Sequence, residues 1–132
     1  MTLQDITCTL EQAKYFQEHD LFQDSLYCLV DSYPHRRIQP IQIRETVPRE
    51  EDILPMPTAE EIIRELPREI EDEYYVGYLG IYKMKDNRMK NNYNVQYSTA
   101  GADNLVCDTI GISIAQALAD MYIHLHKNNL LS

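Results

Sequence analysis

The chain has 132 residues, of which 44% are hydrophobic and 25% charged, and its formal net charge is −9. These proportions are typical of a globular protein and exclude a disordered one, and the length suits a single domain. An acidic chain repels the phosphates of nucleic acids, which disfavours a dedicated DNA- or RNA-binding protein.

Several features bear on where the protein is found. No apolar run approaches the roughly 20 residues of a membrane-spanning helix, and the first six residues do not have the pattern of a signal peptide. The three cysteines, Cys8, Cys28 and Cys107, are odd in number and far apart. That pattern favours buried free thiols over a disulfide framework. We therefore expect a cytoplasmic protein that does not contact a membrane.

The first predicted element is a helix that begins after Thr9. Thr9 and Gln12 have the spacing of a capping box, in which each side chain satisfies a backbone amide of the other residue. One apolar stripe follows at intervals of three residues, made of Leu10, Ala13 and Phe16. We expect the helix to end between Glu18 and Asp20, where Asp20 can adopt the left-handed conformation that closes many helices.

Two strands and a long loop are predicted next. Ser25–Asp31 is apolar on both faces, which favours a strand inside a sheet. Three isoleucines between residues 38 and 43 indicate a weaker strand. Pro40 has no amide hydrogen, so this strand should lie at an edge or be interrupted. The segment Glu45–Pro57 contains three prolines and four acidic residues. We expect it to be a mobile acidic loop.

A second capping box, Thr58 and Glu61, predicts a helix over Ala59–Leu66 that ends before Pro67. The apolar residues of this helix form its expected buried face: Ile62, Ile63 and Leu66.

The remaining elements are two strands and a helix. Tyr74–Met84 and Lys90–Ser98 are predicted strands, and Asp86–Arg88 suits the hairpin connection between them. The last helix is predicted over Ser113–Lys127, with Asn128 or Asn129 closing it in the left-handed conformation. Its core stripe comprises Ile114, Leu118, Met121 and Leu125.

This order of elements predicts an α+β fold. We expect an antiparallel sheet of three to four strands, with about three helices packed mainly on one face. Residues 1–132 would form one domain, with the acidic proline-bearing loop at 45–57.

Three segments resemble those of a group of small uncharacterised proteins from gut Bacteroides-type bacteria and their prophages: Cys8–Lys14, Pro57–Glu61 and Ala117–Leu125. The resemblance touches both ends and the middle of the chain. It implies a bacterial or phage protein in the cytoplasm. It transfers no activity and no functional residue, because none is assigned to that group.

The motifs of catalysis and metal binding are missing from the sequence. His124 and His126 are two residues apart on a predicted helix, so they point in different directions and cannot hold one ion. The carboxylates of Glu69–Glu73 are closely spaced, which is typical of a solvated face and not of a catalytic pair in distinct environments. No glycine-rich phosphate loop and no GxSxG motif occur. We therefore expect no catalytic residue, no cofactor, no metal ion and no enzymatic activity.

Tyrosines are the first feature that indicates an interaction. The chain has ten of them. In the predicted strand 74–84, Tyr74, Tyr78 and Tyr82 lie on one face, and they can contact a partner there together with Tyr93 and Tyr97 of the next strand. The alternative is ordinary cross-strand packing within the sheet.

Basic residues near the hairpin tip are the second feature. Lys85 and Arg88, with Lys83 and Lys90, surround Asp86. Such residues beside tyrosines can grip a single nucleic acid strand. The alternative is that these basic residues discourage edge-to-edge aggregation. The acidic charge of the remaining chain favours this alternative.

The leading hypothesis is therefore a protein-interaction module without catalysis. It would use the tyrosine-bearing sheet face, or the acidic loop, to bind itself or another protein. The other hypotheses are a nucleic acid accessory protein that uses the hairpin 83–90, and a small enzyme with an unrecognised site.

Overall fold

The computed structural model describes residues 6–25, 27–32, 35–40, 53–71, 74–84, 92–99 and 104–131. Within these ranges the helices are α2 (Leu10–Glu18), α3 (Ala59–Glu65) and α4 (Ile114–Lys127). A three-stranded sheet has the order β2-β1-β3, formed by β1 (Tyr27–Ser32), β2 (His35–Pro40) and β3 (Ile53–Pro55). A four-stranded sheet has the order β4-β5-β6-β7, formed by β4 (Glu69–Glu71), β5 (Val76–Met84), β6 (Asn92–Ser98) and β7 (Leu105–Gly111).

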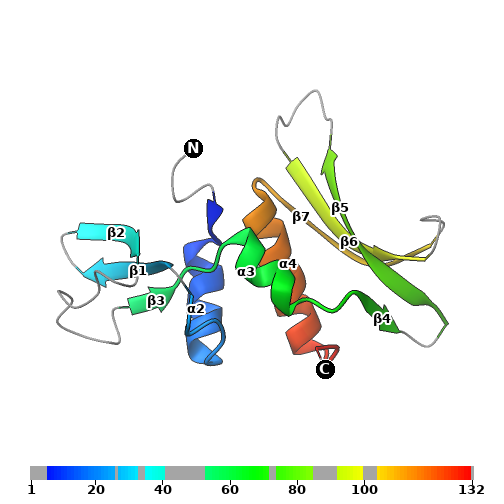
Figure 1. Cartoon of the computed structure of the whole chain (residues 1–132), viewed down its shortest axis with the longest axis horizontal. Coiled ribbons are helices and arrows are strands. Elements are labelled where there is room, and N and C mark those ends of the chain that lie inside the picture. Colours follow the sequence, from blue (N-terminus) through cyan, green and yellow to red (C-terminus); the bar gives the residue numbers. More distant parts are fainter. Residues whose placement is uncertain are drawn as a thin grey trace.

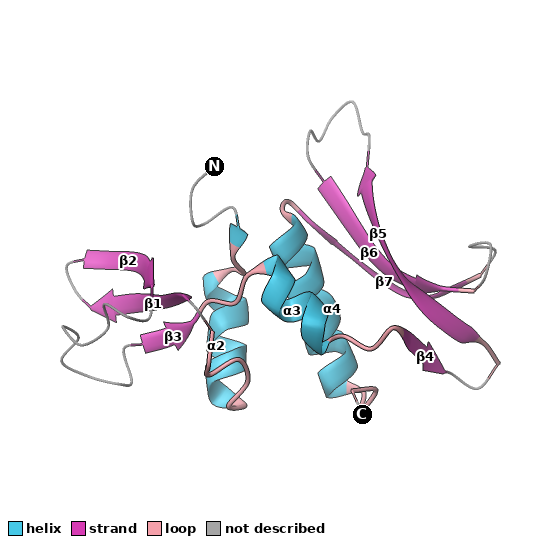
Figure 2. Cartoon of the chain, viewed as in Figure 1, coloured by secondary structure: helices cyan, strands magenta, loops and turns pink. Residues whose placement is uncertain are grey.

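The helices lie between the two sheets, and α4 packs on one face of the four-stranded sheet (Figure 1). Figure 2 shows the same arrangement by element type, with strands at both ends and helices in the middle. Every strand pair is antiparallel. The predicted α+β fold, with an antiparallel sheet and helices packed on one face, is confirmed.

Helix α4 is the centre of the core. Ser113 caps its N-terminus by accepting a hydrogen bond from the Gln116 amide. Its buried residues are Ala115, Ala117, Leu118, Ala119, Met121, Tyr122 and Leu125. The helix closes as predicted, with Asn129 at φ 55° and the Leu130 amide donating to the Leu125 carbonyl. Ile114 is 37% exposed, so its predicted place in the core stripe is wrong. It is the first residue of the helix.

Helix α2 also begins and ends as predicted. The Thr9–Gln12 capping box is present, and Asp20 has φ 55°. The Gln12 side chain in addition donates to the Gln116 carbonyl at 2.9 Å and to the Asp120 carboxylate at 2.6 Å. One glutamine therefore both caps α2 and ties it to α4.

The predicted loop over residues 45–57 is partly wrong. Ile53–Pro55 form strand β3, and Leu54 and Met56 are buried. The Met56 amide donates to the Tyr27 carbonyl at 3.1 Å. Proline at position 55 is tolerated because β3 is an edge strand, where a missing amide hydrogen leaves no neighbour unpaired. Residues 45–52 lie outside the described part of the chain.

The first predicted strand is confirmed as an inner strand, since β1 lies between β2 and β3. The second is confirmed as an edge strand, although the isoleucines at 41 and 43 lie outside the described residues. Both strands belong to the three-stranded sheet and do not join the hairpin strands.

Helix α3 has its predicted capping box and ends at Glu65, with Leu66, the predicted last residue, as its C-cap. Ile62 and Leu66 are buried, whereas Ile63 is 37% exposed and was wrongly placed on the buried face. Residues four apart share a helix face, and the next residue points about 100° away from it. The carboxylate run contains β4, where Glu69 and Glu71 are exposed and Ile70 is buried.

Gly111 should tolerate no side chain, because a Cβ atom there would lie 2.6 Å from the backbone nitrogen of Ala117 in α4. We expect Gly111→Ala to lower the free energy of unfolding by about 1–3 kcal/mol, as overpacking does. Gly80→Ala is the matched control, because its Cβ atom would meet a side chain, the ring of Tyr82 at 2.7 Å, and not backbone atoms. Urea titration of both variants checks this, and equal losses of stability would contradict it.

Burial raises the pKa of the Cys8 thiol to about 12 from 9.0. The folded protein therefore disfavours the thiolate more than the unfolded chain does. We expect the stability from this group to be complete below pH 9 and to fall between pH 9 and 12, by at most about 1.4 kcal/mol per pH unit. Unfolding of wild type and Cys8→Ala at several pH values isolates the effect. Identical slopes in the two proteins would rule it out.

Candidate interaction surface

The face of the four-stranded sheet opposite α4 exposes large apolar side chains. Residues paired directly across antiparallel strands point to the same face. The register pairs Tyr78 with Ser98, Tyr82 with Asn94, and Asn94 with Ile110. We call this surface the outer face. Its apolar residues are 37–53% exposed: Val76, Tyr78, Tyr82, Met84, Leu105 and Ile110.

Tyr82 is held in place on this face by Gly80. A Cβ atom at Gly80 would lie only 2.7 Å from a ring carbon of Tyr82. The ring therefore lies across the glycine backbone, an arrangement that shields a glycine in a strand. Because the ring is already packed, less side-chain entropy is lost when a partner covers it.

Within the described ranges, the charged side chains of the outer face are negative. Glu69 and Glu71 are outward on β4, and Asp108 is outward on β7. The middle of the sheet presents the amides of Asn94 and Gln96, and Asn94 donates to the Asp108 carboxylate at 3.2 Å. The outer face thus has apolar side chains with acidic groups toward both edges.

The structure separates the predicted interaction tyrosines. Tyr78 and Tyr82 lie on the outer face, 47% and 49% exposed, and Tyr74 is 79% exposed just before β5. Tyr97 is fully buried, and its hydroxyl donates to the Pro67 carbonyl at 2.6 Å. Tyr93 is half-buried against the core.

The expectation that Tyr93 and Tyr97 share a face with the other tyrosines is therefore wrong. The register pairs them with Lys83 and Leu79, which alternate with Tyr78 and Tyr82 along β5. They belong to the face that α4 covers. Lys85 and Arg88 lie outside the described residues.

Sequence reasoning missed the part of the outer face on β7. Leu105 and Ile110 belong to a run rich in apolar and β-branched residues, Leu105–Ile110, followed by Gly111. Such a run is the signal of a strand.

A cluster of aromatic and basic side chains joins the C-terminal ends of α2 and α4. The Tyr15 hydroxyl lies 2.6 Å from Nδ1 of His126, and the ring centroids of His19 and His126 are 5.1 Å apart. Lys127 Nζ lies 5.3 Å from the Tyr15 ring. The fold thus brings together two histidines that are far apart in sequence. Among the described residues, no three side chains of His, Cys, Asp or Glu are grouped to hold a metal.

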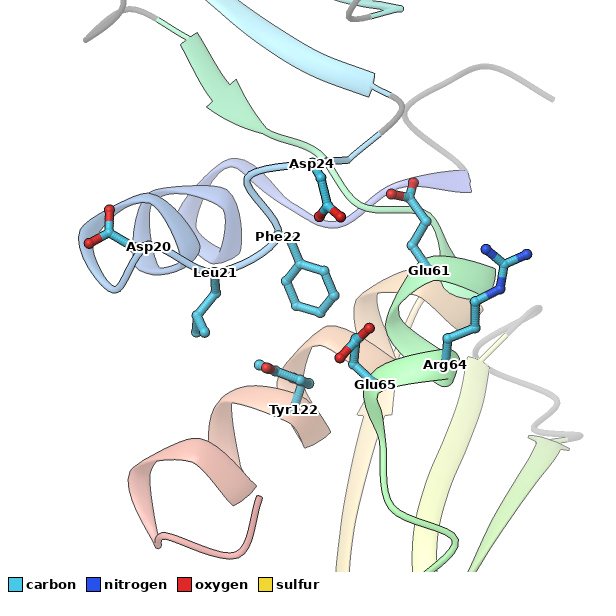
Figure 3. Close-up of a pocket in the computed structure, with 8 residues that line it drawn as sticks. All are labelled: Asp20, Leu21, Phe22, Asp24, Glu61, Arg64, Glu65 and Tyr122. Carbon is cyan, nitrogen blue, oxygen red and sulfur yellow. The ribbon is translucent and has the colours of Figure 1, made fainter. Parts of the chain in front are cut away.

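A pocket of about 490 Å³ opens between the turn after α2, α3 and α4. Phe22, at φ 56°, and Tyr122 line it, with ring centroids 4.7 Å apart. Figure 3 shows the Phe22 ring between Asp24 and Glu65, with Arg64 extending away from it. Arg64 instead binds Glu60 at 2.7 Å. Asp20, Asp24 and Glu65 are exposed to solvent, whereas the Glu61 carboxylate accepts hydrogen bonds from Ser25 and Thr58. The pocket lining has no nucleophile paired with a base.

Comparison with models of protein families, with curated proteins and with solved structures found no match to this chain. Among the helices of the described ranges, none has the length and apolar character needed to cross a membrane.

Loss of the Tyr97 hydroxyl should destabilise the protein, because the partly buried bond to the Pro67 carbonyl would be lost. We expect Tyr97→Phe to lower the free energy of unfolding by about 1–3 kcal/mol. Tyr78→Phe makes the same chemical change on the outer face and should change stability little. Thermal unfolding of both variants measures the difference. If Tyr97→Phe were as stable as wild type, the hydroxyl would have no structural role.

Proposed function

We propose that this chain is a protein-interaction module that binds a partner protein through the outer face. The observation that carries the proposal is the exposure of six large apolar side chains on a sheet face that no described helix covers. An antiparallel sheet with one face in water ordinarily presents polar residues there. Large apolar side chains exposed together on one face instead mark surfaces that bind other proteins.

The charges of the outer face favour a partner with basic groups. Its charged side chains in the described part of the chain are Glu69, Glu71 and Asp108, and the whole chain carries −9. Lysine or arginine at the rim of a partner would complement them, which speeds association and selects against acidic partners. A second copy of the chain would bring the same acidic groups and net charge. We therefore favour a different protein over self-association.

Burial of the outer face would stabilise the complex mainly through its apolar residues. Tyr78 and Tyr82 have large rings, and tyrosine is among the residues that contribute most to binding energy at interfaces. Asn94 and Gln96 between the strands supply donors and acceptors that orient the partner. This division, with apolar area for affinity and few polar groups for orientation, is usual at protein interfaces.

A reducing, cytoplasmic setting forms part of the proposal. It is supported by the free thiols of Cys8 and Cys107. The alternative role in binding nucleic acids gains no support, because the charges on the outer face are acidic and Lys85 and Arg88 lie outside the described residues.

Replacement of Tyr78 and Tyr82 by serine should weaken the binding of the partner at least about tenfold, since both rings lose buried area. Proteins retained by the immobilised wild-type chain are identified by mass spectrometry, purified and titrated against the two chains. Ile63→Ser is the matched control, because it removes a 37%-exposed apolar side chain from α3. Binding should also weaken as salt increases.

Two outcomes would overturn the proposal. One is equal affinity of the purified partner for wild type, the Tyr78/Tyr82 variant and the Ile63 variant. The other is a dimer of wild type in sedimentation that the tyrosine variant abolishes, which would make a second copy the occupant of the outer face.

A further inference from the structure

The two edges of the four-stranded sheet differ in a way that bears on how a partner binds. Edge strands expose unpaired backbone groups, and proteins protect such edges by keeping them short or by placing charges or proline on them. β4 is protected in two of these ways, because it has only three residues and two of them, Glu69 and Glu71, are charged. β7 is longer, with seven residues, Leu105–Gly111, of which Asp108 is the one charged residue and none is proline.

The β7 edge carries exposed apolar side chains on both sides of Asp108. Among the described residues, β7 pairs only with β6. Leu105 and Ile110 are 53% and 51% exposed, and Ile112, just beyond the strand, is 72% exposed. A register shift near Ser98 disturbs the start of β7, so Cys107–Gly111 is its regular part.

β7 is fixed in position by α4. The Thr109 hydroxyl donates to the Ala117 carbonyl at 2.7 Å, and Gly111 lies against the backbone of the same residue. Cys107 Sγ lies 3.8 Å from Met121 Sδ. A strand held in this way can accept a neighbour without first being ordered, which lowers the entropic cost of pairing.

Asp108 opposes pairing of β7 with a second copy of itself. Two-fold symmetric pairing must be antiparallel. If the two-fold axis passes beside Asp108, the Asp108 carboxylates of the two copies lie directly opposite each other. If the axis passes beside Thr109, the two carboxylates are diagonal neighbours, about 7–8 Å apart. Like charges at these positions are destabilising. A cation at the same place in another strand would be attracted.

We propose that an extended segment of the partner protein pairs with the free edge of β7 and places lysine or arginine beside Asp108 and apolar side chains beside Ile110. This inference rests on the proposed function and specifies the form of the partner. The added strand would continue the outer face beyond Leu105 and Ile110. Such strand addition takes its affinity from backbone hydrogen bonds and its specificity from the side chains.

Two synthetic peptides test the pairing. Both copy Leu105–Gly111 with serine in place of Cys107, and one also carries the Asp108→Lys change. We expect the lysine peptide to bind the wild-type chain about fivefold more tightly at low salt, from the difference between attractive and repulsive cross-strand pairs. With the Asp108→Asn protein, the difference between the peptides should shrink.

Amide hydrogen exchange locates the bound peptide. The lysine peptide should slow exchange in β7 and leave β4 unchanged. Equal binding of the two peptides, no binding of either, or protection confined to β4 would overturn the inference. The Tyr78/Tyr82 variant tests the proposed function on a different strand. Suppose that this variant loses partner binding and that neither peptide binds the wild-type chain. Strand pairing would then be rejected, and the outer face would remain the binding surface.

Discussion

The packing of α4 against the inner face of the four-stranded sheet is the interaction on which the rest of the structure depends. On one side of the helix, Ala117 and Met121 contact β7 through Thr109, Gly111 and Cys107. On its other sides it packs against α3 and α2. Its buried residues include small alanines, which let the backbones come close, and larger side chains that fill the space between the layers. The core cluster built around it includes residues from both helices and from β3, β4 and β6.

This packing also determines which face of the sheet is available. A sheet has two faces, and α4 covers the one that carries Val95 and Tyr97. Because side chains alternate along a strand, Tyr78 and Tyr82 are then directed away from the core. The same helix also holds β7, the strand at the free edge, through Ala117. The proposed binding surface is therefore a consequence of the core.

The contacts of α2 add a second layer of organisation. Gln12 connects the start of α2 to α4, and Tyr15 meets His126 near the C-terminal ends of both helices. Phe16, Phe22 and Tyr122 contact one another between these points, with centroid distances of 4.7–5.9 Å. Such aromatic contacts add specificity to apolar burial because their geometry is restricted. They also shape the pocket beside Asp24 and Glu65.

Local sequence by itself determined the ends of the helices. The capping residues Thr9, Thr58 and Ser113, and the left-handed closures at Asp20 and Asn129, depend on interactions within a few residues of the chain. Alternation likewise determined the hairpin strands and the inner position of β1.

Only the tertiary structure decided which face of each element is covered and which distant strands are neighbours. Tyr97 was assigned to the wrong face because the hairpin register sets that choice, and β3 was missed because its pairing with β1 comes from a segment distant in sequence. The burial of Tyr97 and the exposure of Tyr78 depend on where α4 packs, and no local pattern in either strand specifies that position.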